Sequence, residues 1–321
     1  MPSVPGDLNC VLLNACGAAY NIAPGTCTYI ADGVFAPRVP YQGAPKAACG
    51  GSNLINAATV GQCPFGIVVA FRGTLPPAES DPDSLLDWLQ DFFAEPTTCT
   101  TGPTRVPGQV HSGFFEATTS IIAEIQTLVS GYQPSAANPV YVTGHSKGGA
   151  MASIGAYILS QNLGLPVAQP VVTFASPKPG DINFASGLQK ILGQTRFEND
   201  RDIVPLLPPP TVFIDLLVAI VNLIPTVGSR LAALFRTAEN WNYFPVGTMQ
   251  FITSAFQVIP NETIEAQTWD VAKEFGEDAW AEDFSSFGAA HSLLPGDGYN
   301  SGVCGLQRSA ALRVDAPRGR G

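Results

Sequence analysis

The chain has 321 residues, of which 45% are hydrophobic, and this is enough to build a full hydrophobic core. Its formal net charge of −10 argues against a nucleic-acid partner, because nucleic acids require clustered lysine and arginine. The same charge disfavours electrostatic attraction to an anionic membrane but not hydrophobic contact with lipid. We find no internal repeat and no linker long enough to separate two domains, so residues 1–321 are predicted to form a single domain.

The seven cysteines bear on the compartment of the protein. Six of them lie before residue 100 and the seventh is Cys304. They form no CxxC pair and no metal-ligand spacing with histidine, so we predict no metal site. Disulfides that close the N-terminal region are the better interpretation, and they predict a secreted protein. Because seven is odd, at least one thiol is free or pairs between chains.

Two segments precede the central motif of the chain. The run Gly66-Ile67-Val68-Val69-Ala70-Phe71 is typical of a buried parallel strand and leads into Arg72-Gly73-Thr74. Residues 84–93 then predict an amphipathic helix, which Pro96 ends. Its apolar face would contain Leu85, Trp88, Leu89, Phe92 and Phe93. Taken alone, this pattern fits a surface helix that packs its apolar face on the core.

The most informative motif is Gly144-His145-Ser146-Lys147-Gly148. It follows the β-type run 139–143 and precedes a helical run at 150–161. Gly-x-Ser-x-Gly between a strand and a helix is the nucleophile elbow of α/β-hydrolases, in which the serine projects from a strained turn. The alternation of apolar strands with helical runs predicts a mostly parallel central sheet with helices on both faces.

The acid that would orient a catalytic histidine is expected after a later strand. Residues 171–175 read as an apolar strand, 181–192 as an amphipathic helix and 194–197 as a short strand. Asp200 and Asp202 follow, at the carboxyl end of that strand, where ligands of open α/β sheets bind. The spacing does not choose between them.

A long apolar insertion follows, at about residues 208–242. Thr211 to Ile224 holds eleven apolar residues of fourteen between prolines, and Leu231 to Phe235 continues it. The run is shorter than the roughly 20 residues of a transmembrane helix. We predict either a buried helix against the sheet or a cap that forms an acyl-binding wall.

The general base is found by elimination. The chain has three histidines, and His145 cannot fold back onto the hydroxyl of the adjacent Ser146. The triad of this fold runs serine, acid, histidine along the chain, which excludes His111 and leaves His291. The oxyanion donors of this fold are the backbone N–H after the nucleophile and an N–H after an earlier strand. Lys147 and Thr74 occupy those two places.

Together these segments resemble the fungal-type class 3 lipases. The resemblance covers about residues 65–210 and extends to His291; its motifs are 71–74, 88–92, 110–114, 142–149, 173–177 and 199–209. It implies that Asp202 is the acid, that Thr74 is the first oxyanion residue and that His111 is a buried structural residue. It makes residues of about 75–97 a lid over the serine. It further implies a bridge from Cys304 to the N-terminal segment. Lys147 departs from the family, in which an apolar residue usually follows the serine.

The sequence therefore predicts a secreted serine hydrolase that cleaves carboxylic esters of lipids at an oil–water interface. No metal or organic cofactor is implied. Two alternatives stay open at this point. One is an esterase for soluble esters such as feruloyl esters, which would use the same residues. The other is an inactive lipid-binding protein on a hydrolase scaffold.

Overall fold

The computed structural model describes residues 7–35, 40–74, 82–209, 211–223, 228–260, 263, 271, 285–294, 296 and 298–305. Its centre is an eight-stranded sheet, in the order β14-β13-β11-β9-β8-β5-β4-β3. The five strands from β13 to β5 are parallel, and antiparallel strands flank them on both sides. The predicted mostly parallel sheet is therefore confirmed. In chain order its strands are β3 (Lys46–Gly50), β4 (Asn56–Cys63), β5 (Gly66–Phe71), β8 (Val140–His145), β9 (Val171–Phe174), β11 (Gln194–Asn199), β13 (Thr248–Ile252) and β14 (Val258–Pro260).

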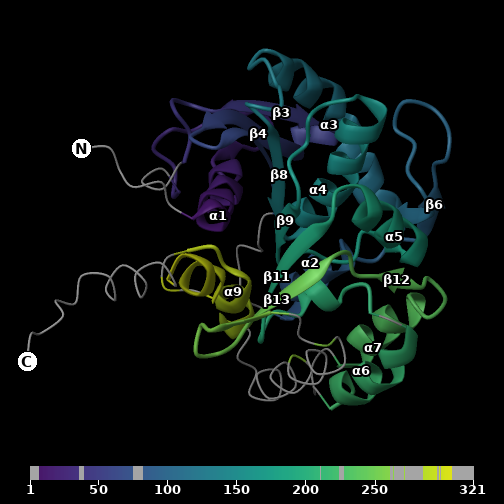
Figure 1. Ribbon diagram of the computed structural model, residues 1–321. Coiled ribbons are helices and arrows are strands. Elements are labelled where there is room, and N and C mark those ends of the chain that lie inside the picture. The colour runs from purple at the N-terminus through teal and green to yellow at the C-terminus, as the bar shows by residue number, and fades with distance from the viewer. Residues whose placement is uncertain are drawn as a thin grey trace, which may run out of the picture.

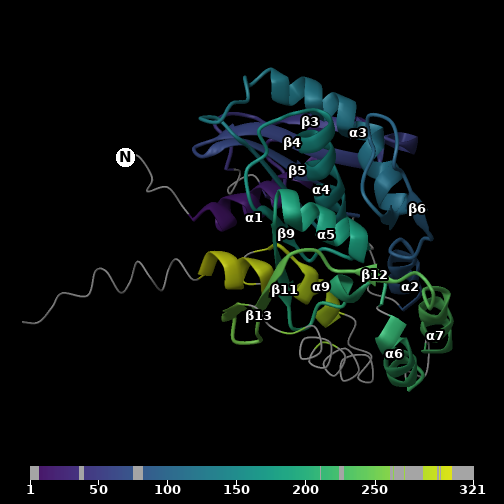
Figure 2. The ribbon, with the colours of Figure 1, turned by 45° about the vertical axis from the view of Figure 1, so that its right-hand side comes forward.

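Helices cover both faces of this sheet, as predicted (Figures 1 and 2). Side chains of a strand alternate between the faces, so Val69 and Phe71 of β5 join one core cluster and Val68 and Ala70 join the other. The first face packs on α3 (Ser112–Ser130), α4 (Lys147–Tyr157) and α5 (Ile182–Ile191). The second face packs on α1 (Leu8–Ala19) and on the helical residues 298–305. Chain segments from the two ends therefore share one side of the sheet.

Shorter elements connect these layers. A four-stranded sheet has the order β12-β10-β7-β6, and a two-stranded sheet pairs β1 with β2. Their bounds are β1 (Ile22–Ala23), β2 (Thr28–Tyr29), β6 (Pro96–Thr98), β7 (Gln109–His111), β10 (Gly180–Asp181) and β12 (Tyr243–Phe244). Single helical turns occupy Ser52–Leu54, Ile158–Asn162, Val204–Leu206 and Thr211–Phe213. The last described helix before residue 298 is α9 (Ser285–His291).

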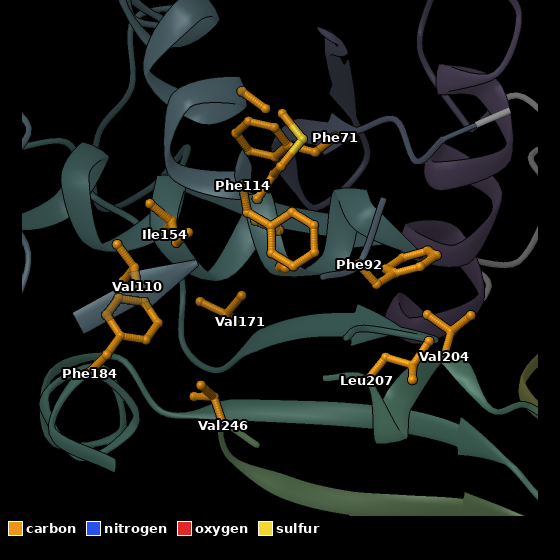
Figure 3. Packing of buried hydrophobic residues seen from close by; sticks show 14 of the residues in the cluster. Phe71, Phe92, Val110, Phe114, Ile154, Val171, Phe184, Val204, Leu207 and Val246 are labelled. Carbon is orange, nitrogen blue, oxygen red and sulfur yellow. The ribbon is translucent and has the colours of Figure 1, made fainter. Parts of the chain in front are cut away.

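The amphipathic segment after Thr74 is shorter than predicted. Its helix α2 spans Pro82–Gln90, so Phe92 and Phe93 follow the helix instead of belonging to it. The N–H of Phe92 bonds to the carbonyl of Leu89, three residues back, and this tighter turn ends the helix. Phe92 is nevertheless fully buried, beside Phe114 and near Val204 and Leu207 (Figure 3). Residues 75–81 of the predicted lid and the side chain of Leu85 lie outside the described residues.

The apolar insertion forms two helices, α6 (Ile214–Val221) and α7 (Gly228–Thr237), where the sequence predicted one helix from 211 to 224. The two helices pack against each other at one end of the molecule (Figures 1 and 2). Phe235 of α7 stacks on Phe93, with ring centroids 6.0 Å apart. The insertion therefore meets the segment that follows α2.

Two disulfides join the N-terminal region. Cys10 pairs with Cys304 across 294 residues, and Cys27 pairs with Cys49. The expected bridge from Cys304 to the N-terminal segment is thus present. Cys16 and Cys63 are buried thiols and Cys99 is partly exposed. In the parts of the chain that the structure describes, no helix is long and apolar enough to cross a membrane.

Candidate active site

Ser146 stands on a sharp turn between β8 and α4. Its backbone has φ 59° and ψ −139°, in the left-handed range of φ that non-glycine residues rarely adopt. A Cβ atom on Gly144 would lie 1.9 Å from the carbonyl oxygen of Gly148. A Cβ on Gly148 would lie 2.2 Å from the carbonyl oxygen of Phe71. The two glycines of the motif therefore allow strand, turn and helix to approach each other around the serine.

His291 and Asp202 meet although they lie 89 residues apart. The Nδ1 atom of His291, at the end of α9, is 2.9 Å from Oδ2 of Asp202. The other carboxylate oxygen accepts the N–H of Val204 at 3.0 Å. The Asp202 side chain is 1% exposed, so the bond to the imidazole is shielded from water. Between the two candidate acids, Asp202 is the one whose carboxylate contacts the histidine.

A third donor to Asp202 is Tyr299, which the sequence did not predict as a site residue. The Tyr299 hydroxyl donates to Oδ2 of Asp202 at 2.7 Å and accepts the N–H of Asn199 at 3.1 Å. Burial, followed by the charge of Asp202, raises the pKa of Tyr299 well above its ordinary value. The hydroxyl therefore stays protonated and keeps donating. No motif marks this tyrosine in the sequence.

His145 was excluded as the base, and the structure gives it a different place. The Tyr20 hydroxyl lies 2.8 Å from Nδ1 of His145, and Nε2 of His145 lies 2.8 Å from the carbonyl oxygen of His291. Burial lowers the pKa of His145 well below its ordinary value, and the neighbouring His291 adds to this. The ring is therefore neutral, accepts from Tyr20 and donates to the backbone of His291. This chain of bonds links the end of α1 to the backbone of His291.

One side-chain atom each of Ser146 and His291 is buried and without a hydrogen-bond partner among the described residues. These atoms are Oγ of Ser146 and Nε2 of His291. The rings of His145 and His291 lie 4.5 Å apart between centroids, so the imidazole sits next to the residue that precedes the serine. Buried polar atoms normally find partners. No hydrogen bond joins these two atoms in this structure, and each is free to take part in proton transfer when substrate arrives.

Thr74 and Lys147 flank the serine from two elements. A Cβ on Gly73 would lie 2.8 Å from Cβ of Ser146, which places the backbone before Thr74 against Ser146. Lys147 is the first residue of α4, where the N–H groups have no carbonyl of their own helix to bond. The Oγ1 atom of Thr74 is also buried and unpartnered among the described residues. These donors could stabilise negative charge on a substrate oxygen.

Of the four predicted lid residues, Trp88 contacts the site and the other three pack in the core or against α7. The indole of Trp88 is edge-on to the imidazole of His291, with ring centroids 5.3 Å apart. Leu89 and Phe92 are buried in the main core cluster, and Phe92 also contacts Trp88 at 5.0 Å between centroids. Phe93 turns toward α7 and Trp241. The polar Asp87 and Gln90 are exposed. Helix α2 thus covers the histidine with its apolar face.

His111 is a buried residue at the start of α3, not a second base. Its Nδ1 accepts the N–H of Phe114 at 3.3 Å, and its Nε2 donates to the carbonyl of Phe92 at 3.1 Å. Its ring stacks on Phe114, with centroids 3.7 Å apart. Burial lowers the pKa of His111 to about 4. The ring is therefore neutral at neutral pH and joins α3 to the segment after α2.

This pKa predicts an acid-sensitive fold. Between pH 6.5 and 4 the unfolded chain binds a proton at residue 111 that the folded chain does not bind. The free energy of unfolding should therefore decrease as the pH is lowered from 6.5 to 4. The decrease should be about 1.4 kcal/mol per pH unit for this residue. His111→Asn keeps a good helix cap but cannot titrate. Urea unfolding at several pH values gives the slope of the free energy of unfolding against pH. For the variant this slope should be smaller by the equivalent of about one proton. Equal slopes in the variant and the wild type would contradict the low pKa of His111.

A buried lysine holds the loop that carries Asp202. The Lys178 ammonium donates to the backbone carbonyls of Pro205, Leu206 and Pro208. The backbone N–H of Lys178 also donates to the carbonyl of Leu207 at 2.8 Å. Lys178 is only 2% exposed. The hydrogen bonds of Lys178 thus hold residues 205–208 against the loop that follows β9.

The part of the chain that matches known proteins is close to the part, about residues 65–210, that resembles the class 3 lipases in sequence. Residues 68–212 match the model of the family described as Lipase (class 3). A secreted mono- and diacylglycerol lipase of Fusarium solani is 34% identical over 148 residues, which cover 44% of this chain and 39% of that protein. A lipase of Rhizomucor miehei is 31% identical over 147 residues, covering 44% of this chain and 38% of that protein. A phospholipase A1 of Oryza sativa subsp. japonica is 29% identical over 234 residues, covering 60% and 54%. The matches thus span less than two thirds of these relatives.

Solved structures agree on the fold. The native Rhizomucor miehei lipase propeptide complex superposes with a TM-score of 0.56 at 23% identity, covering 84% of this chain and 77% of that chain. A structure from a family of fungal lipases superposes with a TM-score of 0.58 at 16% identity, covering 89% and 94%. The fold is thus that of the α/β-hydrolases. By the family match, residues 68–212 of the chain are similar to the class 3 lipases.

Proposed function

We propose that this protein is a serine hydrolase that cleaves carboxylic esters of lipids, of the triacylglycerol lipase type. The observation that carries the proposal is the bond of 2.9 Å between His291 and Asp202, with the free nitrogen of that histidine buried beside the serine turn. The relatives named lipase support the lipid substrate class. No metal or organic cofactor is needed for this chemistry.

In the proposed mechanism Ser146 attacks the ester carbonyl carbon while His291 takes its proton at Nε2. Asp202 holds the imidazole in the tautomer with Nδ1–H and stabilises the imidazolium. The N–H groups of Thr74 and Lys147 stabilise the tetrahedral oxyanion, a contribution of about 3–4 kcal/mol for one such donor. His291 then protonates the leaving alcohol, and water, activated by the same histidine, releases the acyl chain from Ser146.

Covalent labelling tests this proposal directly. A fluorescent organophosphonate should label the protein, and Ser146→Ala should abolish the label because the attacking oxygen is gone. Ser153→Ala is the matched control, since Ser153 lies on α4 with its hydroxyl bonded to Gly149 and Gln194. Absence of label on the folded wild-type protein, probed at an oil–water interface where the proposed lid is open, would refute the catalytic role of Ser146. It would instead favour the inactive lipid-binding alternative.

An esterase for soluble esters, such as feruloyl esters, uses the same catalytic residues. The apolar side chain next to the site distinguishes the two, because the indole of Trp88 lies against the imidazole of His291. That surface favours lipid esters over soluble aromatic esters. Rates across acyl chains of increasing length, beside a feruloyl ester, separate the two functions.

We further propose that residues 75–97 act as a lid that moves aside at an oil–water interface. Trp88 lies against the ring of His291, so substrate cannot reach the imidazole until the indole withdraws. Activity should therefore rise sharply once the substrate exceeds its solubility limit. Replacing Trp88 by alanine should reduce that step, because less apolar surface covers the site. Smooth saturation of the wild type through the solubility limit would count against a gating lid.

The proposed location is extracellular. Two disulfides support an oxidising compartment, and a relative is named as secreted. The labelling probe, applied separately to culture medium and to washed cells of the source, also reports the location. A label confined to the cells would contradict secretion.

A further inference from the structure

The ring of His145 is held in place by the aromatic side chains around it. The residue is only 4% exposed. The rings of Tyr20, Tyr299 and His291 surround it, with centroids 5.8, 5.9 and 4.5 Å from the centroid of His145. A ring that is packed on several sides cannot turn freely, so the directions of its two nitrogen atoms are fixed. The mechanism proposed above gives this ring no task.

The two nitrogen atoms of this ring have different partners and different roles. Nε2 lies 2.8 Å from the carbonyl oxygen of His291. A carbonyl oxygen only accepts hydrogen bonds, so Nε2 carries the proton and donates. Because burial keeps the ring neutral, Nδ1 is the acceptor, and the hydroxyl of Tyr20, 2.8 Å away, donates to it. Tyr20 therefore fixes the tautomer in which His145 can bind the backbone of His291.

The carbonyl that receives this bond lies at the end of α9. His291 is the last residue of that helix, and the last carbonyls of a helix have no N–H of their own helix to accept from. The imidazole of His145 supplies a donor to this end of the helix. Since His145 directly precedes Ser146, the bond ties the main chain of the proposed base to the neighbour of the proposed nucleophile.

His291 thus has one anchor on its side chain and a second on its main chain. The side-chain anchor is the bond from Nδ1 to Asp202 at 2.9 Å. A ring held at one nitrogen alone can still pivot about that bond and carry Nε2 away from Ser146. The main-chain anchor opposes this, because it fixes the backbone from which the ring extends. Such precision matters for catalysis, since a misplacement of about 1 Å can cost about 100-fold in rate.

We propose that His145 is a positioning residue that sets where His291 stands relative to Ser146, and that Tyr20 holds His145 in the tautomer this task requires. The inference rests on the proposed function and adds two residues to the same site. Neither residue gains or loses a proton during the reaction. His145 acts through the backbone of His291, and Tyr20 acts through His145. Tyr20 and His291 both lie outside residues 68–212, which match the family model.

Two substitutions of His145 separate its two hydrogen bonds. The amide nitrogen of a glutamine can occupy the position of Nε2, so His145→Gln can still donate to the carbonyl of His291. The shorter asparagine places its amide near the position of Nδ1, so His145→Asn can accept from Tyr20 but cannot reach His291. Both variants remove the buried ring, so both should lose a similar free energy of unfolding in urea. A difference in kcat between them then reports the bond to His291.

His145→Asn should lower kcat on a short-chain ester about 10- to 100-fold, with little change in KM. His145→Gln should recover most of this loss. Tyr20→Phe, which removes a single oxygen atom, should lower kcat about 3- to 10-fold. Tyr41→Phe is the matched control, because it removes a buried tyrosine hydroxyl that bonds to Thr59 at 2.8 Å, on the same side of the sheet. Its kcat should stay at the wild-type value.

Equal kcat in the two His145 variants, at equal stability, would overturn the inference. A loss that falls on KM alone would also overturn it, because a misplaced base acts in the transition state and not in binding. If neither His145 variant folds, Tyr20→Phe decides: a loss of kcat that Tyr41→Phe does not share supports the inference, and wild-type kcat overturns it.

The proposed function is tested separately from this inference. A wild type that neither cleaves the ester nor takes the organophosphonate label would reject the proposed function itself. A labelled, active wild type with equal kcat in His145→Asn and His145→Gln would reject only the positioning role.

Discussion

Replacing His291 with alanine should lower kcat for ester hydrolysis by roughly five to six orders of magnitude. Without the imidazole, the hydroxyl of Ser146 has no group to accept its proton. The loss should fall on kcat more than on KM, because the base acts in the transition state and not in binding. The values of kcat and KM for wild type and variant are measured on a short-chain ester in stirred assays. Circular dichroism verifies that the variant is folded.

Two further variants make this test specific. Asp202→Asn should lower kcat about 10⁴-fold, because an amide favours the wrong tautomer of the imidazole. His111→Asn is the matched control, since it removes another buried histidine that bonds to Phe92 and Phe114. Its kcat should change far less than that of His291→Ala. Near-wild-type activity in a folded His291→Ala variant would remove this histidine from the mechanism.

Replacing Lys178 with methionine should be the most destabilising of the changes considered. The change removes the ammonium that donates hydrogen bonds to the carbonyls of Pro205, Leu206 and Pro208. Each buried carbonyl left unsatisfied costs about 1–3 kcal/mol. Removing the buried charge recovers part of that cost. We therefore expect a net loss of about 3–5 kcal/mol, which urea unfolding measures.

The same change should also reduce activity in the protein that remains folded. Residues 205–208 begin three positions after Asp202, so loosening them disturbs the carboxylate that bonds to His291. Lys178→Arg retains donors and should lose less stability than the methionine variant. Lys190→Met removes an exposed lysine of α5 and should change stability by no more than about 0.5 kcal/mol. If Lys178→Met unfolds at the same urea concentration as Lys190→Met, the ammonium does not hold the loop.

The insertion after residue 208 shows how tertiary contacts resolve an ambiguous pattern. An apolar run of this kind fits a helix against the sheet or a cap, and hydrophobic periodicity does not separate the two. In the structure the run is two helices that bury their apolar faces mainly against each other. The exposed ion pair of Arg236 with Asp215, at 2.7 Å, joins their polar sides. The contact of Phe235 with Phe93 then connects the insertion to the lid segment.

The sequence by itself determined the features that depend on local periodicity and chain order. Strands such as β5 and β9 follow from short apolar runs, and the turn at Ser146 follows from glycines at two fixed positions. His291 follows from elimination, because only one histidine comes after the acid candidates. These signals depend on neighbouring residues or on the order of residues along the chain. They can therefore be recognised without knowing any tertiary contact.

The tertiary structure alone decided which distant groups meet. The spacing of Asp200 and Asp202 does not choose between them; the family resemblance points to Asp202, and the position of His291 in space agrees with it. The bonds of Tyr299 to Asp202 and of Tyr20 to His145 span 97 and 125 residues. Packing of both chain ends on one face of the sheet brings these residues together. Such contacts arise from the arrangement of whole elements, and no spacing along the chain encodes them.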